Sequence, residues 1–177
     1  HPIVAGTVVG THNGHIRNHR ELFDKFDMNR FAQVDSEVIF RMFATADSPE
    51  DFFENRFPKL EGRASVVFTD YAIPHLIYVV KGNNPLTVYL DKDNGIMIYG
   101  STEEILEPVK KAFNVVKIKL DEMTMMRVNT KTLKVIRRKV RFDAKELKSI
   151  NDSGAKSTKQ NWTFNGGRWW NKTSGVS

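Results

Sequence analysis

A short polar motif near the start of the chain contains residues that could stabilise a developing negative charge. Residues 3–9 are apolar or small at nearly every position, and the turn-like motif Thr11-His12-Asn13-Gly14 follows. A buried strand that ends in such a turn can present the Asn13 amide and the Gly14 backbone N–H to one small pocket. Donors held in this way suit an oxyanion. An isolated Asn-Gly pair is also an ordinary tight turn, so the motif alone leaves both interpretations open.

The elements around this motif alternate between helical and strand patterns, with most strands late in the chain. The spacing of apolar residues predicts a helix over 16–26, a second over 36–44 and a third that begins at the Ser48 cap. Strands are predicted at 63–70, 75–81, 86–90, 96–99, 115–120, 124–128 and 132–142. Further helices are predicted at 102–113, where Pro108 suggests a kink or a restart, and at 144–150.

Length and composition indicate one globular domain with a tail. The chain has 177 residues, enough for one sizeable core. It contains no cysteine, which removes disulfides and a thiol nucleophile and favours a reducing compartment. Neither a signal peptide nor a transmembrane pattern is present, so we expect a cytoplasmic protein without a membrane partner. Because residue 1 is histidine and not methionine, we expect that polypeptide upstream of it is missing.

Charge and aromatic residues gather toward the C-terminus. The net charge is +6, and residues 131–148 are strongly basic. Such a segment could meet nucleic acid or an acidic protein, or be a solvated strand face; no nucleic-acid motif accompanies it, so we do not expect a nucleic-acid partner. Residues 1–150 are predicted to form the domain. Residues 151–177 form a basic tail whose Trp162, Trp169 and Trp170 are candidate anchors for a protein partner.

Several motifs occur together in the order of one known family. They are His1-Pro2, His12-Asn13-Gly14, residues 34–39 (VDSEVI), Leu60-Glu61-Gly62 with the strand after it, Pro85-Leu86, residues 100–103 (GSTE) and residues 120–123 (LDEM). Over residues 1 to about 140 the chain resembles the class II glutamine amidotransferase domain, an N-terminal nucleophile hydrolase, and is similar to the glutaminase domain of glucosamine-fructose-6-phosphate aminotransferase. The resemblance implies an α+β fold, a four-layer α/β/β/α sandwich that is N-terminally incomplete here.

The resemblance also implies roles for individual residues. In this family an N-terminal cysteine attacks the carboxamide carbon of glutamine, and the released ammonia passes to an acceptor. Asn13 and Gly14 would form the oxyanion hole, and Asp35 would hold the α-amine of glutamine. The alternative for Asp35 is a helix cap. His1 and His12 would be structural and near the pocket wall. No cofactor and no metal are implied, since Asp35, Glu37 and His75 do not form a convincing metal site.

The chain departs from the family pattern at its start. The family's catalytic cysteine and the arginine that binds the glutamine carboxylate both lie upstream of its His-Pro, and neither is present here. By itself the chain should not hydrolyse glutamine. It could be completed by a companion polypeptide, be an excerpt of an intact enzyme, or be an inactive module that serves protein assembly through its tail. Because an apolar strand at 3–9 needs neighbours, we expect a partner segment beside it.

Overall fold

The computed structural model describes residues 1–144 and the backbone of two further strands, β10 (Trp162–Asn165) and β11 (Arg168–Asn171). The chain divides into two units, His1–Glu146 and Leu147–Ser177. In the second unit β10 and β11 pair as an antiparallel hairpin, with Trp162 opposite Asn171 and Trp170 opposite Thr163. The tail therefore contains regular backbone structure, while its role in partner binding stays a prediction. Of the helix predicted at 144–150, all but Ala144 lies outside the described residues.

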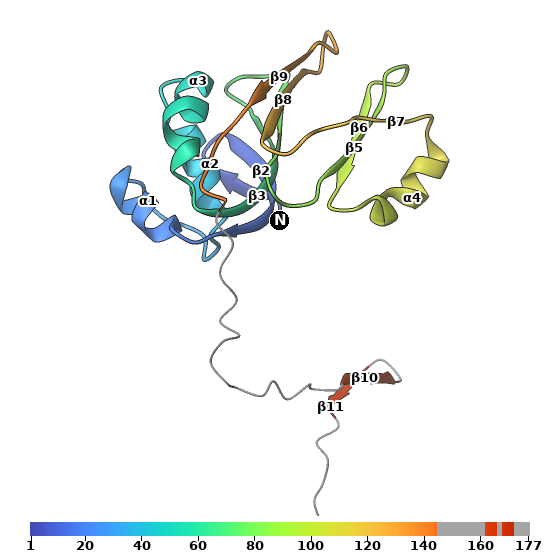
Figure 1. The fold of residues 1–177 in the computed structure, drawn as a ribbon, viewed down its shortest axis with the longest axis horizontal. Coiled ribbons are helices and arrows are strands. Elements are labelled where there is room, and N and C mark those ends of the chain that lie inside the picture. The colour runs from blue at the N-terminus through green and yellow to red at the C-terminus, as the bar shows by residue number, and fades with distance from the viewer. Residues whose placement is uncertain (145–161, 166–167, 172–177) are drawn as a thin grey trace, which may run out of the picture. The chain divides into compact units, whose positions relative to one another are not determined.

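The first unit contains two antiparallel sheets (Figure 1). The six-stranded sheet has the order β1 (Ile3–Ala5), β2 (Val8–Ile16), β3 (Gly62–Asp70), β4 (Leu76–Lys81), β8 (Thr124–Asn129) and β9 (Val135–Lys139). The three-stranded sheet has the order β6 (Ile96–Gly100), β5 (Thr87–Asp91) and β7 (Val116–Lys117). The helical elements are α1 (His19–Lys25), α2 (Glu37–Ala44), α3 (Pro49–Asp51), η1 (Phe52–Arg56), η2 (Phe57–Lys59) and α4 (Glu103–Ala112).

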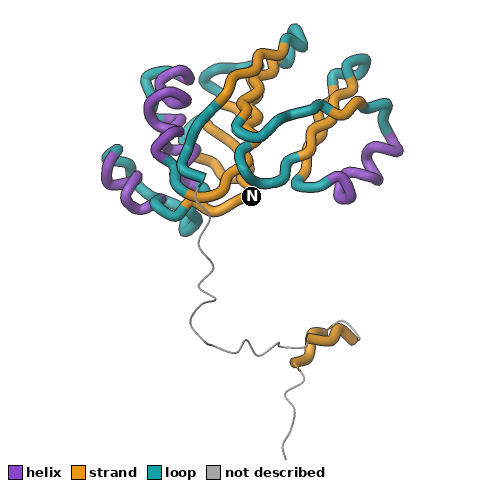
Figure 2. Tube along the Cα trace, viewed as in Figure 1, coloured by secondary structure: helices purple, strands orange, loops and turns teal. Residues whose placement is uncertain are grey.

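Helices α1–α3 and the two turns after them cover one face of the six-stranded sheet (Figure 2). The interface is aromatic, because Phe43 of α2 has its ring 4.7 Å from Phe68 of β3, 5.1 Å from Phe52 and 5.2 Å from Tyr78. All four side chains are buried. Each such side chain stabilises the fold by about 1.5–3 kcal/mol through removal of apolar surface from water, so this cluster fixes α2 on β3.

The other face of the six-stranded sheet packs on the three-stranded sheet. Val67 and Val79 project from that face because side chains alternate along a strand, and they share a second apolar core with Val88 of β5. Tyr89, the next residue of β5, points the other way and donates a hydrogen bond to Glu103 of α4 at 2.9 Å. The three-stranded sheet thus packs on the six-stranded sheet through β5, and α4 is bonded to β5 through Tyr89.

The first strand differs from the prediction. Residues 3–9 do not form one strand buried on both faces; they fold back at Gly6, whose φ of +64° suits a tight turn, and β1 becomes the edge of the sheet. Val4 accordingly has 61% of its surface exposed. The strand also does not stop at Thr11, because β2 continues through Ile16. The helix predicted from residue 16 therefore begins only at His19.

The remaining differences are smaller and have local causes. β7 covers only Val116–Lys117, and β9 covers Val135–Lys139, which are the parts of the predicted strands that find a pairing partner. α4 runs through Pro108 as one helix, so no second helix starts there. His75, predicted to be packed or at an edge within a strand, is an exposed turn residue with φ +71° just before β4.

Glu37 fixes the start of α2, although its type would suggest a surface position. Its side chain is only 1% exposed. The carboxylate accepts hydrogen bonds from the backbone N–H of Phe31 at 3.0 Å and of Ala32 at 2.6 Å, and from Arg41 Nε at 3.1 Å. A buried charge is tolerated when it is satisfied in this way. Glu37 therefore ties the loop before α2 to the helix.

We expect Glu37→Ala to lower the free energy of unfolding by about 3–5 kcal/mol, because it leaves Arg41 and two backbone N–H groups without their acceptor. Urea denaturation followed by circular dichroism measures the change. Glu21→Ala is the matched control, since Glu21 is exposed in the first turn of α1 and should contribute less than about 1 kcal/mol. Equal effects of the two substitutions would contradict the anchoring role.

Candidate functional site

The His-Asn-Gly motif lies within β2 and not in a turn after it. β2 pairs with β3 over nine positions, with His12 opposite Val66, Asn13 opposite Ser65 and Gly14 opposite Ala64. Because side chains alternate along a strand, Asn13 and His12 project from opposite faces of the sheet. Asn13 is on the face toward the second sheet, and His12 is on the face covered by helices.

Gly14 is required by the close approach of β2 to β3. Its φ is +151°, and a Cβ added there would lie 1.9 Å from the Arg63 carbonyl oxygen and 2.7 Å from Nε2 of His12. Both distances are far below van der Waals contact. Only glycine lets the strand continue at this point, which is why the motif extends β2 instead of ending it.

Asn13 lines a hollow of about 200 Å³ between the two sheets, together with His1, His12, Ser65, Gly100 and Ser101. The Asn13 Nδ2 donates a hydrogen bond to the Pro85 carbonyl at 3.0 Å. An amide nitrogen has two donors, so the second one is available to a ligand. His1 also lines this hollow. Gly14 and Asp35 are not among the residues that line it.

Asp35 is fixed at the far end of β2. Its Oδ2 accepts a hydrogen bond from the Ile16 backbone N–H at 2.6 Å and lies 3.4 Å from Nδ1 of His15. The side chain is 20% exposed. A carboxylate has about four acceptor positions, so Asp35 can accept a ligand amine while keeping its bond to Ile16. The structure thus places Asn13 and Asp35 on neighbouring elements without bringing both into one hollow.

His12 is a buried cross-link between three elements. The residue is 8% exposed. Nδ1 lies 2.8 Å from Ser36 Oγ at the start of α2, and Nε2 lies 3.2 Å from the Arg63 carbonyl of β3. Since a carbonyl only accepts, Nε2 carries the proton and Nδ1 accepts from the Ser36 hydroxyl. Burial lowers the pKa of His12 below its ordinary value of 6.5, which keeps the ring neutral.

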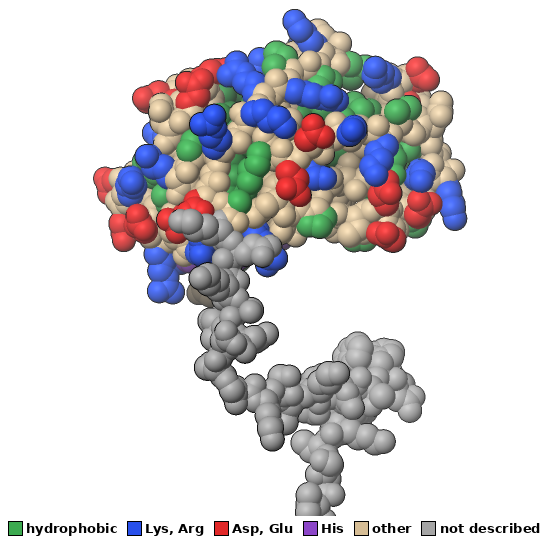
Figure 3. All heavy atoms as spheres, in the orientation of Figure 1, with side chains coloured by type: hydrophobic (Ala, Val, Ile, Leu, Met, Phe, Trp, Pro, Cys, Tyr) green, Lys and Arg blue, Asp and Glu red, His purple; other side chains and the backbone are tan. Residues whose placement is uncertain are grey.

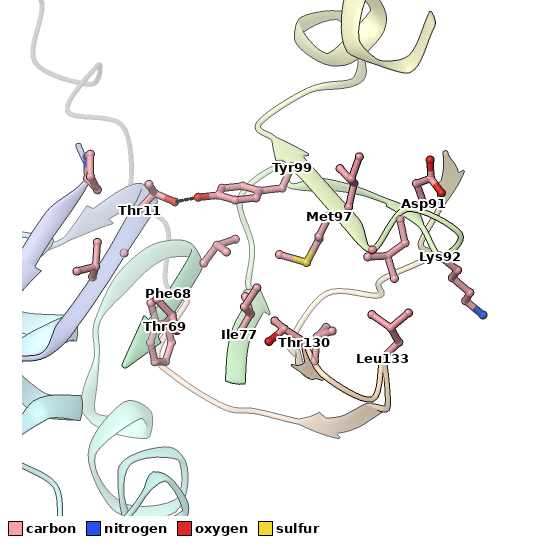
Figure 4. Close-up of a pocket in the computed structure, with 18 residues that line it drawn as sticks. Thr11, Phe68, Thr69, Ile77, Asp91, Lys92, Met97, Tyr99, Thr130 and Leu133 are labelled. Carbon is pink, nitrogen blue, oxygen red and sulfur yellow. Dashed lines mark hydrogen bonds between the residues drawn. The ribbon is translucent and has the colours of Figure 1, made fainter. Parts of the chain in front are cut away.

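A larger cavity of about 340 Å³ adjoins the hollow and is mainly apolar (Figure 4). Val67, Ile77 and Val128 line it from one sheet, and Leu90 and Met97 line it from the other. The Thr11 hydroxyl donates a hydrogen bond to the Tyr99 hydroxyl at 3.2 Å. Thr11, Tyr99 and Val67 line both spaces, so the Thr11–Tyr99 bond marks the boundary between a polar hollow and an apolar cavity.

The comparisons with known proteins identify the family. The model of the glutamine amidotransferase domain matches residues 1–108, more than half of the chain. The chain belongs to this family. The resemblance read from the motifs is therefore confirmed.

Two curated relatives match this chain over different lengths. The chain is 30% identical over 95 residues to a glutamine--fructose-6-phosphate aminotransferase of Vibrio parahaemolyticus, a match that covers 50% of the chain and 16% of the relative. It is 25% identical over 134 residues to a 7-cyano-7-deazaguanine synthase of Saccharolobus solfataricus, a match that covers 75% of the chain and 28% of the relative. The chain thus spans less than a third of the length of either.

Two solved structures share the fold. The glutamine phosphoribosylpyrophosphate amidotransferase of Bacillus subtilis has a TM-score of 0.60 at 15% identity, covering 78% of this chain and 30% of that one. A glutamine aminotransferase class-II domain protein of Silicibacter pomeroyi has a TM-score of 0.51 at 16% identity, covering 80% of this chain and 70% of that one. These likenesses confirm the predicted fold class for the amidotransferase domain.

The structure shows site residues that sequence reasoning missed. Ser36 is the first residue of the helix predicted at 36–44, and its hydroxyl bonds to His12 and makes no capping hydrogen bond. The Pro85 carbonyl and the Tyr99 hydroxyl come from segments far from the motif in the sequence. The available signal was indirect, since Pro85-Leu86 and Gly100 already belonged to the family pattern that carried the resemblance.

The surface of the amidotransferase domain is basic above β8 and β9 (Figure 3). Arg137, Arg138 and Lys139 are exposed on β9, and Arg138 lies 3.9 Å from Glu50. Within residues 1–144 no three histidine or acidic side chains are grouped so as to hold a metal ion. None of the described helices is both long and apolar enough to cross a membrane.

We expect Gly14→Ala to destabilise the domain by about 3–5 kcal/mol, from overpacking against the Arg63 carbonyl and backbone strain together. Chemical denaturation measures this change. Gly95→Ala provides the control, because Gly95 has a φ of +65° but no atom within 4 Å of an added Cβ, so only conformational strain of about 1–2 kcal/mol is expected. An effect at Gly14 no larger than that at Gly95 would refute the steric argument.

Burial of His12 should make stability depend on pH. In the unfolded chain His12 gains a proton near its ordinary pKa of 6.5, whereas the folded chain resists protonation to a lower pH. Its contribution is therefore complete above pH 6.5 and is lost as the pH falls below it, with a slope of up to about 1.4 kcal/mol per pH unit. His19, whose pKa burial also lowers, acts in the same direction.

We expect His12→Asn to reduce this slope between pH 7 and 5 by up to one proton's contribution, while lowering the stability at pH 7. Denaturation midpoints across that range measure it. An unchanged slope would show that His12 is not the group resisting protonation.

Proposed function

We propose that this domain binds L-glutamine and, when completed by polypeptide that carries an N-terminal cysteine, hydrolyses the carboxamide to release ammonia. The observation that carries the proposal is the position of Asn13, whose amide lines a hollow at the boundary of two sheets in a chain of the glutamine amidotransferase family. Its second N–H can donate to the oxygen that becomes negatively charged when the carboxamide is attacked. The Gly14 backbone N–H is proposed as the second donor.

Asp35 is proposed to hold the α-amine of glutamine. A hydrogen bond between two charged groups stabilises a complex by about 1.5–3 kcal/mol, and the bond from Ile16 already fixes the carboxylate. For the amide and the amine of one ligand to be held together, glutamine must extend along the end of β2 from Asn13 toward Asp35. His1 is proposed to form part of the wall near the carboxamide end.

The nucleophile must come from polypeptide that precedes His1 or accompanies the chain. The open edges of the two sheets support such a completion. Among the described residues β1 and β9 are the edges of the six-stranded sheet, and β6 and β7 are the edges of the three-stranded sheet. Open strand edges readily accept another strand. Val8 and Val9 already pair with β3. The partner segment predicted beside residues 3–9 is therefore expected to pair with β1. The ammonia would pass to an acceptor held elsewhere in the complete protein.

A second candidate function is an inactive amidotransferase-like module that serves protein assembly. The observation that favours it is the paired backbone of β10 and β11, which places three tryptophans of a basic tail in a regular hairpin. An isolated two-stranded hairpin is only marginally stable in water, so this segment would gain from a partner protein. The lack of cysteine in the chain is compatible with both functions.

The test is hydrolysis of L-glutamine by the natural full-length protein, with its N-terminus determined by mass spectrometry. We expect Asn13→Ala to lower kcat by about 10²- to 10³-fold, through loss of an oxyanion donor. We expect Asp35→Asn to raise KM by about 10- to 100-fold, because the neutral amide loses the charge that attracts the ammonium.

Two control variants and one outcome complete this test. Asn114→Ala and Asp47→Asn change exposed residues away from the hollow, and we expect both to leave hydrolysis unchanged. A full-length protein without an N-terminal cysteine and without glutamine hydrolysis would overturn the enzymatic proposal and favour the assembly module.

A further inference from the structure

His12 and Ser36 each stand next to a proposed glutamine-binding residue. His12 directly precedes Asn13 in β2, and Ser36 directly follows Asp35 at the start of α2. Their side chains meet at 2.8 Å, from Nδ1 to Oγ, and both residues are buried, at 8% and 5% exposure. The two segments that would hold opposite ends of glutamine are thus joined to each other behind the site.

A second hydrogen bond joins the same two segments four residues further along β2. The Ile16 backbone N–H donates to Asp35 Oδ2 at 2.6 Å. Two hydrogen bonds at separate positions along a strand prevent one segment from sliding or tilting on the other. A single bond would allow the segments to rotate about it. The hydrogen bond between His12 and Ser36 is the one nearer to Asn13.

The His12 ring also supports Gly14. It lies so close beneath this residue that an added Cβ would come within 2.7 Å of Nε2, and Nε2 itself is held at 3.2 Å from the Arg63 carbonyl. The ring therefore restricts how the β2 backbone can move relative to β3 at Asn13 and Gly14. Its two nitrogens fix that backbone to β3 on one side and to α2 on the other.

We propose that His12 and Ser36 are positioning residues that set the separation between the carboxamide donors, Asn13 and Gly14, and the amine acceptor, Asp35. The proposal rests on the proposed function, since it concerns the same ligand. Without the pair, each end of the site could still bind its own group. The two ends would no longer match the length of one glutamine, and the advantage of holding both ends at once would be lost.

The test compares two substrates in the natural full-length protein. L-glutamine carries the α-amine, and glutaramic acid is the same molecule without it. The measured quantity is the ratio of kcat/KM for L-glutamine to that for glutaramic acid. We expect a ratio of at least 10 in the unaltered protein, and a fall of at least five-fold in Ser36→Ala, because the hydroxyl that bonds to His12 is gone.

Conservative variants separate positioning from general loss of structure. Ser36→Thr keeps a hydroxyl and should keep the ratio. His12→Asn retains an acceptor near the place of Nδ1, whereas His12→Gln retains a donor near the place of Nε2 and loses the bond to Ser36. We expect His12→Asn to preserve more of the ratio than His12→Gln, with thermal melting of each variant measured alongside.

The possible results are distinct. If Ser36→Ala lowers kcat/KM equally for both substrates, so that the ratio stays constant, the pair is merely structural and the inference is wrong while the proposed function stands. If the unaltered protein shows no preference for L-glutamine over glutaramic acid, Asp35 does not hold the amine, and the proposed site fails together with the inference.

Discussion

The pairing of β2 with β3 is the constraint on which the candidate site depends. The two strands are in register over nine residues, and the alternation of side chains along β2 sends His12 toward the helices and Asn13 toward the second sheet. His12 is therefore buried and cross-links the sheet to α2, whereas its neighbour Asn13 lines the hollow. A shift of register by one residue would exchange these positions. The close approach of β2 to the Arg63 carbonyl helps to hold this register, because only a residue without a Cβ fits at position 14.

Much of the fold could be predicted because local signals agreed with the final packing. The cap and proline at Ser48-Pro49 begin α3 as predicted, with Ser48 Oγ accepting from the Asp51 N–H at 3.0 Å. The β-branched run at 63–70 forms β3 within one residue of its predicted bounds. The family resemblance extended these local predictions to the correct fold class, which periodicity alone does not give.

The bounds of the first two strands could not be predicted because the sequence features of residues 3–14 favour conflicting structures. Residues 3–9 are apolar enough for a buried strand, and only Gly6 marks the turn that divides them. Asn13-Gly14 reads as a turn in sequence, yet tertiary pairing with β3 makes it a strand. The contacts of Pro85, Tyr99 and Ser36 with the motif follow from sheet packing, so no local pattern reveals them.

In the proposed reaction, the position of Asn13 limits where a nucleophile could act. A carboxamide oxygen bound by the free Asn13 N–H would lie about 2.7–3.1 Å from it, and an attacking sulfur would need to approach the carbon of that group to about 3–3.5 Å. The Pro85 carbonyl holds the other N–H at 3.0 Å and occupies that side of the amide. In the proposed reaction the sulfur would therefore approach from a side of the amide that Pro85 does not occupy. His1 lines the same hollow, so polypeptide that precedes His1 in the proposed complete enzyme would start beside the proposed carboxamide site.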